Sequence, residues 1–128
     1  MNLLLDTHIA LWAIADSPKL PEKAREMIES SRSSVWVSVA TIWEIAIKHS
    51  LGRGDMPVSG KDALSYFRES GYQLLSIEPE HVLALESLPT RHADPFDRIL
   101  IAQALAEPLR LVTHDSTVAR YSDTIVEV

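Results

Sequence analysis

Residues 2–15, NLLLDTHIALWAIA, place a short apolar run directly before a largely apolar helix. Leu3–Leu5 has the length and composition of a strand buried on both of its faces. Asp6 and Thr7 follow and can cap a helix over residues 8–15, because their side-chain oxygens accept hydrogen bonds from the free N–H groups of a first helical turn. A buried strand that leads into a helix favours an α/β fold.

The alternation of strands and helices continues to the end of the sequence. Further strands are predicted at 35–38, 73–77, 109–113 and 125–128, and helices at 21–31, 39–51, around 64–67, 79–88 and 94–106, with loops at 52–60 and 89–94. The pattern predicts a single domain over residues 1–128, with helices on both faces of a central, mostly parallel sheet of four to five strands. Ligands of such sheets bind beyond the carboxyl ends of the strands, where Asp6 and Asp115 are expected.

Composition and charge narrow the class of protein. The chain has 128 residues, 46% of them hydrophobic, and no cysteine, so it can bury a core without disulfides and has no thiolate metal ligands. Its net charge of −6 disfavours a module that binds nucleic acid through basic residues alone. It disfavours a nuclease less, since metal-binding carboxylates contribute negative charge. The start lacks the features of a signal peptide, and no apolar run is long enough to span a bilayer, so a cytoplasmic protein without membrane contact is expected.

Four acidic residues are candidate site residues, and each has a simpler explanation. Asp6 and Asp115 could cap helices, and Asp97 could complement the dipole of the helix that begins near residue 94. Glu44 could form a surface ion pair with Lys48, four residues later. However, the helix around Glu44 is apolar on almost every side, which predicts that it is largely buried. A carboxylate in such a helix is costly unless it is paired or bound to a metal.

If these carboxylates share a pocket, they need a cation. Two carboxylates about 4 Å apart repel by roughly 4 kcal/mol at an effective dielectric of about 20. Mg²⁺ and Mn²⁺ prefer oxygen ligands, whereas Zn²⁺ favours histidine and cysteine. A site of this kind suits the hydrolysis of phosphodiester bonds.

Four segments resemble the acidic motifs of PIN domains in order and in spacing. They are LLLDTH at 3–8, SVATIWEI at 38–45, HADPFDRILIAQA at 92–104 and LVTHD at 111–115. Within that family the sequence is most similar to the VapC-like toxins of bacterial and archaeal toxin–antitoxin pairs. The resemblance covers nearly the whole chain.

The resemblance implies a PIN-like three-layer α/β/α sandwich and a Mg²⁺- or Mn²⁺-dependent endoribonuclease. RNA phosphodiester bonds would be hydrolysed by metal-activated water, and the protein would be the toxin of a type II toxin–antitoxin pair. It also implies a homodimer that a cognate antitoxin inhibits. By this resemblance Asp6, Glu44 and Asp97 hold the metal, and Asp115 completes the site directly or through water.

Residues beside the four acids have two interpretations each. Thr7 and Thr113 could orient a carboxylate or a metal-bound water, or could serve only as a cap and a strand residue. Arg98 could contact an RNA phosphate or pair with Asp94, which is itself expected to cap a helix. Three histidines could contact RNA or transfer protons, but surface or packing roles are commoner; they are His8, His92 and His114.

Two surface features are compatible with partners. Lys48, His49 and Arg53 form a basic cluster that could follow a phosphate backbone or could be solvated charge. The helix over residues 8–15 is apolar beyond one face, and an antitoxin helix, a dimer mate or a neighbouring helix could cover the excess.

Two other classes of protein compete with the nuclease. A phosphoryl-transfer receiver would carry an acidic pair after the first strand and a late lysine, and a haloacid-dehalogenase-like phosphatase would carry Asp-x-Asp. This chain has Asp6-Thr7-His8, and no lysine follows Lys61. The second alternative is a non-catalytic interaction module on the same scaffold, which the presence of all four acids disfavours.

Overall fold

The structure of the chain is a computed structural model, and it describes residues 1–52, 56–89 and 94–128. Within these residues five strands form one sheet: β1 (Asn2–Leu5), β2 (Ser34–Ser38), β3 (Gln73–Leu75), β4 (Arg110–Thr113) and β5 (Val126–Glu127). The strand order is β3-β2-β1-β4-β5, and every neighbouring pair is parallel. The predicted parallel sheet of four to five strands is therefore confirmed.

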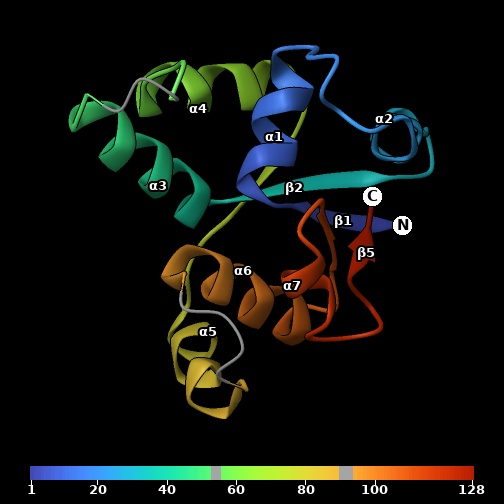
Figure 1. Cartoon of the computed structure of the whole chain (residues 1–128), viewed down its shortest axis with the longest axis vertical. Coiled ribbons are helices and arrows are strands. Elements are labelled where there is room, and N and C mark those ends of the chain that lie inside the picture. Colours follow the sequence, from blue (N-terminus) through green and yellow to red (C-terminus); the bar gives the residue numbers. More distant parts are fainter. Residues whose placement is uncertain (53–55, 90–93) are drawn as a thin grey trace.

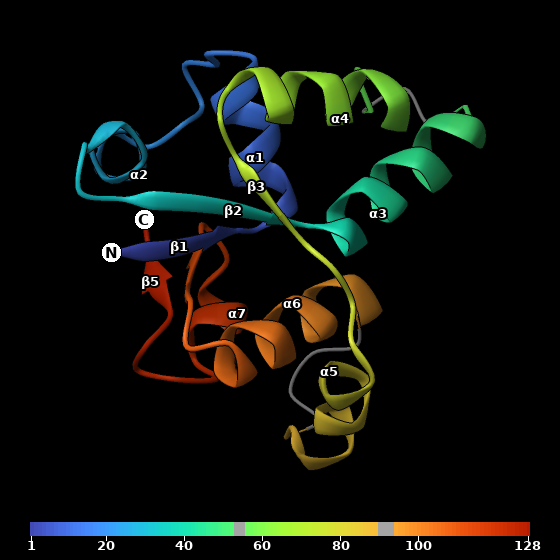
Figure 2. The same ribbon diagram turned by 180° about the vertical axis from the view of Figure 1, so that it is seen from behind.

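Helices cover both faces of this sheet. They are α1 (Thr7–Ile14), α2 (Glu22–Glu29), α3 (Val39–Ser50), α4 (Gly60–Glu69), α5 (Pro79–Ala84), α6 (Pro95–Ala106) and α7 (Ser116–Ala119), with a 3₁₀ turn, η1 (Leu85–Ser87). In Figure 1, α1, α2 and α4 lie on one side of β1 and β2, whereas α5, α6 and α7 lie on the other. Figure 2 shows the edge strand β3 in front of β2, with the chain continuing from it to α5. The predicted three-layer sandwich is confirmed.

The strand β1 shows why its apolar run is continuous. Leu3, Leu4 and Leu5 are all fully buried, and successive side chains of a strand point to opposite faces. Leu3 and Leu5 belong to the apolar cluster that includes Ile9 of α1, whereas Leu4 belongs to a second cluster with Leu100 of α6. Each face of the strand thus has its own core.

The strand order also places the candidate site. The chain moves outward from β1 to β2 and β3, and then returns to add β4 on the other side of β1. The point of reversal therefore lies between β1 and β4, and ligands of open α/β sheets bind there, beyond the carboxyl ends of the strands. Asp6 directly follows β1, and Asp115 lies two residues beyond β4. We call this region the carboxyl edge, meaning the carboxyl ends of β1, β2 and β4.

Most predicted elements are present, with shifts of one or two residues at their ends. The predicted helix at 79–88 is divided into α5 and the turn η1, and the predicted strand at 73–77 ends at Leu75. In the described part of the chain, no helix combines the length and the apolar character needed to cross a bilayer.

Candidate functional site

Asp6 is held at the end of β1 by the neighbouring strand β4 and by the first turn of α1. Its backbone N–H donates to the Val112 carbonyl of β4, 3.1 Å away. Its Oδ1 accepts from the Ile9 N–H at 3.0 Å and caps α1, while its Oδ2 accepts from the Thr113 hydroxyl at 2.5 Å. The cap that the sequence suggests is therefore present, but it uses one carboxylate oxygen, and the other points toward β4.

Burial raises the pKa of the Asp6 carboxyl, which is 7% exposed. The hydrogen bonds from Thr113 and Ile9 and the nearby His8 lower this pKa, and the negative charge of Asp115, the weakest of these influences, raises it. Asp6 and Asp115 therefore repel each other weakly across the reversal point of the sheet. A cation placed between them would relieve this repulsion.

Thr113 joins the ends of β1 and β4. Its hydroxyl donates to Asp6 and accepts a hydrogen bond from the Asp115 backbone N–H at 3.0 Å. Asp115 is exposed and caps α7, because its Oδ1 accepts from the N–H groups of Thr117 (2.8 Å) and Val118 (3.4 Å). The hypothesis that Thr113 orients a carboxylate agrees with this geometry.

Glu44 lies on the inward face of α3 and is 4% exposed. Its Oε1 accepts from the Thr7 hydroxyl at 2.7 Å, and its Oε2 accepts from the Lys48 ammonium at 2.6 Å. The Thr41 hydroxyl lies 3.2 Å from that of Thr7 and must donate to it, because the one hydroxyl proton of Thr7 is used on Glu44. The ion pair that the spacing suggests is therefore present, but its acidic partner is buried.

The prediction that α3 is largely buried is wrong. Val39 is 38% exposed and Trp43 is 55% exposed, and the Trp43 ring packs edge-on against Phe96 with centroids 5.0 Å apart. Glu44 is buried because it shares the inward face with Thr41 and Ile45. An apolar composition on every side did not distinguish this inward face from a face that is left open.

Asp97 is half-buried in the first turn of α6. The predicted cap of this helix is confirmed: Asp94 Oδ1 accepts from the N–H groups of Phe96 (2.8 Å) and Asp97 (3.1 Å). Arg98 donates to the carbonyls of Pro89 (2.8 Å) and Leu85 (3.3 Å) and approaches the Tyr121 hydroxyl at 3.3 Å. These contacts brace η1 and the segment after α7 against α6. The contact between Arg98 and RNA stays a prediction.

Two chains of contacts therefore meet at adjacent residues. One connects Asp115 through Thr113 to Asp6, and the other connects Thr7 to Glu44 and Lys48. Asp97 lies in the first turn of α6, a helix that packs against α3. These contacts bring Asp6, Glu44 and Asp115 to the carboxyl edge.

A different group of residues satisfies a simple distance test for a metal site. In residues 1–52, 56–89 and 94–128, one trio of His and acidic side chains has its ligand atoms all within 4.8 Å of one another: Glu80, His81 and Glu107. We did not predict this trio from the sequence. A histidine three residues after Glu78, at the start of a helix, has the spacing of a capping box, and this was the available signal.

The hydrogen bonds of His81 disfavour metal binding by this trio. His81 Nδ1 accepts from the Glu78 N–H at 3.0 Å, so the proton of the neutral ring lies on Nε2. Nε2 donates this proton to Glu107 Oε2, 2.6 Å away. A metal ligated by Nε2 would have to displace that proton while Nδ1 still accepts. His81 and Glu107 therefore form a closed hydrogen-bonded connection between α5 and the end of α6.

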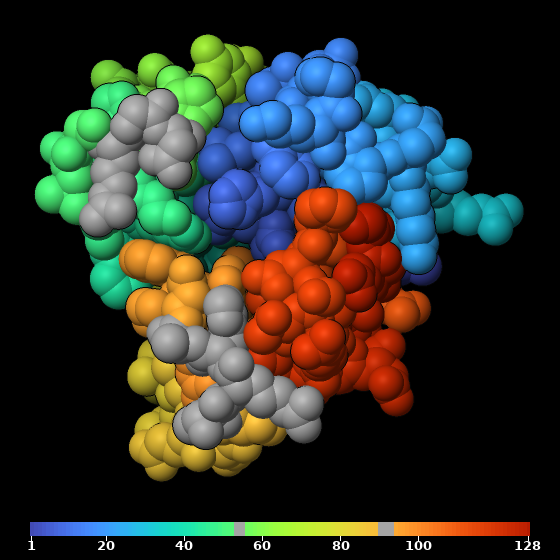
Figure 3. Space-filling model, in the orientation of Figure 1, coloured from blue at the N-terminus to red at the C-terminus, as the bar shows by residue number. Residues whose placement is uncertain are grey.

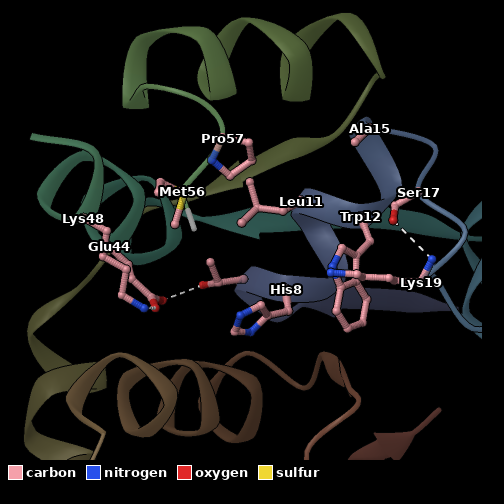
Figure 4. Close-up of a pocket in the computed structure, with 11 residues that line it drawn as sticks. His8, Leu11, Trp12, Ala15, Ser17, Lys19, Glu44, Lys48, Met56 and Pro57 are labelled. Carbon is pink, nitrogen blue, oxygen red and sulfur yellow. Dashed lines mark hydrogen bonds and ion pairs between the residues drawn. The ribbon is translucent and has the colours of Figure 1, made fainter. Parts of the chain in front are cut away.

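A groove of about 430 Å³ opens beside Glu44. We call it the site groove, and Figure 4 shows Glu44 and Lys48 at one end of it and His8, Trp12 and Lys19 along the α1 side. The Trp12 ring lies 5.8 Å from that of His8 and 5.9 Å from that of His114. In Figure 3 the surface of α1, in dark blue, lies in a hollow between α3 and the C-terminal residues.

A second groove of about 340 Å³ continues along α1 and is mainly apolar. We call it the apolar groove; it is lined by Leu11, Ile14, Ala15, Pro57, Val58 and Tyr66. The excess apolar surface of α1 is thus covered partly by α4 and its preceding segment, and partly left open.

Of the predicted basic cluster, Lys48 is paired with Glu44, His49 is exposed, and Arg53 lies outside the described residues, as does His92.

Carboxylates gathered at the carboxyl edge of a parallel α/β sheet define a class of candidate sites for hard divalent cations. The chain belongs to the PIN domain family, because the model of the PIN domain matches residues 3–123. No curated protein matches the sequence.

Several solved structures share the fold. VapBC2 from Rickettsia felis, bound to a DNA fragment of its promoter, is similar with a TM-score of 0.73 and 19% identity, over 99% of this chain and 98% of that one. VapBC-1 from nontypeable Haemophilus influenzae has a TM-score of 0.64 and 16% identity, over 100% and 97%. FitAcB from Neisseria gonorrhoeae has a TM-score of 0.62 and 18% identity, over 98% and 96%. These similarities confirm the predicted PIN fold.

Proposed function

We propose that this chain is a cytoplasmic, Mg²⁺- or Mn²⁺-dependent endoribonuclease that acts as the toxin of a type II toxin–antitoxin pair. We further propose that residues 1–128 act as one domain. The observation that carries the proposal is the pair of buried carboxylates, Asp6 and Glu44, each oriented by a threonine hydroxyl at the carboxyl edge.

The residues at this edge fit a hard divalent cation. We propose that Asp6, Glu44, Asp97 and Asp115 hold it, since all four offer carboxylate oxygens and the chain has no cysteine. The raised pKa of Asp6, caused mainly by burial, marks a place where added positive charge is favourable. When bound there, the cation would polarise a phosphodiester and lower the pKa of water.

Two threonines support these ligands. Thr113 holds Asp6 Oδ2, and Thr7 holds Glu44 Oε1, so each carboxylate is fixed in rotation before any cation arrives. Such partners of metal ligands set orientation and affinity. The Thr113 hydroxyl lowers the pKa of Asp6 and so favours its ionised form, which is the form that a cation requires.

We propose that RNA lies in the site groove. Although the net charge of the chain is −6, the described lining of this groove carries Lys19 and Lys48 against the carboxylate of Glu44. The rings of His8 and Trp12 lie beside the same groove and could contact unpaired bases. Lysines with nearby aromatic rings are a common arrangement for single-stranded nucleic acid.

We also propose two protein partners. A segment of a cognate antitoxin would fill the apolar groove on α1, and the similarity to toxin–antitoxin complexes supports this assignment. A homodimer would cover the exposed face of α3, where Val39 and Trp43 lie. Sedimentation equilibrium of the wild type and of Trp43→Glu tests the dimer: the proposal expects a dimer and a monomer, respectively.

The function is tested by incubating labelled total RNA and structured RNAs with purified protein in Mg²⁺, in Mn²⁺ and in EDTA. The proposal expects cleavage in either metal and none in EDTA. Asp6→Asn should remove cleavage while circular dichroism remains that of a folded protein. Asp62→Asn, at an exposed position in α4, is the matched control and should cleave normally. Full cleavage by Asp6→Asn, or by the wild type in EDTA, would contradict the proposal.

A further inference from the structure

The Lys48 ammonium occupies one of the two oxygens that Glu44 could offer to a cation. The Nζ–Oε2 distance is 2.6 Å, and Oε1 already accepts from Thr7. Glu44 is almost wholly buried, and a buried carboxylate is costly unless it is paired. Lys48 supplies the pairing charge from within the same helix, four residues away.

A divalent cation ligated by Glu44 would meet this ammonium. Two positive charges on one carboxylate repel each other, and an oxygen that accepts a short N–H bond is less available to a metal. The same proximity that stabilises Glu44 without metal therefore opposes the loading of metal. Asp6 has no comparable competitor in its described contacts, because its two oxygens accept from a backbone N–H and a hydroxyl.

Lys48 also has a route away from Glu44. Its side chain is 30% exposed and lines the site groove, and Figure 4 shows it extending from α3 beside that of Glu44. The ammonium of a lysine lies at the end of a flexible four-carbon stem and is strongly hydrated. Withdrawal from Glu44 would move the charge into the groove without altering α3.

We propose that Lys48 is an exchangeable counter-ion of Glu44, which neutralises this carboxylate in the metal-free protein and leaves it when a divalent cation binds. The inference rests on the proposed metal site and adds its regulation: Lys48 keeps the empty site stable and sets the metal concentration at which it fills. The released ammonium then lies in the groove proposed for RNA, where it can bind a phosphate.

The test is the affinity for Mn²⁺, measured by isothermal titration calorimetry without RNA. Lys48→Gln should bind Mn²⁺ more tightly than the wild type by roughly tenfold, the scale of one hydrogen bond to a charged group. Its metal-free melting temperature should fall, and Mn²⁺ should restore it. Lys48→Arg keeps the competing charge and should bind no more tightly than the wild type. Lys19→Gln, which removes a charge from the same groove, should leave the Mn²⁺ affinity unchanged.

The results separate the inference from the proposed function. Equal or weaker Mn²⁺ binding by Lys48→Gln, with clear binding by the wild type, would overturn the counter-ion role and leave the metal site intact. No binding by any variant would overturn both. If Lys48→Gln fails to fold, ¹⁵N signals of lysine ammonium groups in the wild type decide the question. The Lys48 signal, identified by its loss in Lys48→Arg, should move on addition of Mg²⁺ while that of Lys19 does not, and an unmoved Lys48 signal would overturn the inference.

Discussion

Two polar clusters, one at the carboxyl edge and one between α5 and α6, can be compared directly. One is the carboxyl edge, where Asp6 and Glu44 are held by hydroxyls and by Lys48. The other is the α5–α6 corner, where His81 bonds Glu107 and the start of α5. Both contain carboxylates, and the corner satisfies the simpler distance test for a metal site.

The two clusters differ in whether their hydrogen-bonding groups are already satisfied without a metal. At the corner a neutral histidine accepts at one nitrogen and donates at the other, so the cluster is complete without a cation. At the carboxyl edge, buried negative charge is neutralised by a half-exposed lysine, and the pKa of Asp6 remains raised by burial and by Asp115. Proximity of ligand atoms is therefore a weaker sign of a metal site than buried carboxylates at the ends of parallel strands.

The largest expected effect separates the two clusters by activity. Glu44→Gln should lower RNA cleavage by at least about 100-fold, beyond the 10–100-fold typical of residues that only support a metal ligand. Glu107→Gln makes the same chemical change at the corner and should cleave RNA at the wild-type rate. Initial rates on one RNA substrate in Mg²⁺ measure both. Equal losses in the two variants would abolish the distinction between the clusters.

The next effect concerns the threonine that joins β1 and β4. Thr113→Val keeps the shape of the side chain but removes the donor to Asp6 and the acceptor for the Asp115 N–H. Cleavage should fall by roughly 10–100-fold, and the free energy of unfolding by about 1–3 kcal/mol. Thr113→Ser retains the hydroxyl and serves as the control in both assays. A valine variant as active as the serine variant would show that this hydroxyl has no part in the site.

A stability effect is expected at the corner alone. His81→Leu leaves the Glu78 N–H and the Glu107 carboxylate without their partner, so the free energy of unfolding should fall by about 1–3 kcal/mol. The affinity for Mn²⁺ should not change. Urea denaturation and calorimetry measure the two quantities, with His49→Leu, at an exposed position, as the control. Weaker Mn²⁺ binding by His81→Leu would assign the metal to the corner.

The smallest effect is a pH dependence of stability at the carboxyl edge. Because the folded state raises the pKa of Asp6 above its ordinary 3.8, ionisation of Asp6 costs the metal-free protein stability. This cost is absent below 3.8 and grows as the pH rises through the raised value. In EDTA, Asp6→Asn should therefore gain melting temperature relative to the wild type over that interval. Asp62→Asn should show no such trend, and a constant difference for Asp6→Asn would contradict the assignment.

Local patterns in the sequence predicted much of this arrangement. The run Leu3–Leu5 predicted a doubly covered strand, and Asp94 was predicted as a cap, because both depend on neighbours in the chain. The pairing of Glu44 with Lys48 has the same origin. The burial of α3 was predicted wrongly, since composition does not say which face of an apolar helix finds a partner, and Trp43 is left open.

Contacts between distant residues required the fold. Thr113 meets Asp6 across 107 positions because β4 pairs with β1, and the sequence suggested only that both strands end at one edge. The bond between His81 and Glu107 spans 26 positions and depends on how α5 packs against α6. A sequence pattern also does not show which side-chain atoms donate hydrogen bonds and which accept them. These roles distinguish the α5–α6 corner from the carboxyl edge.

The location of bound Mn²⁺ tests the central claim most directly. Anomalous difference density from crystals grown with Mn²⁺ should show a peak beside Asp6 and Glu44, with the Lys48 ammonium withdrawn from Glu44. A peak at His81 and Glu107 with none beside Asp6 would contradict the account.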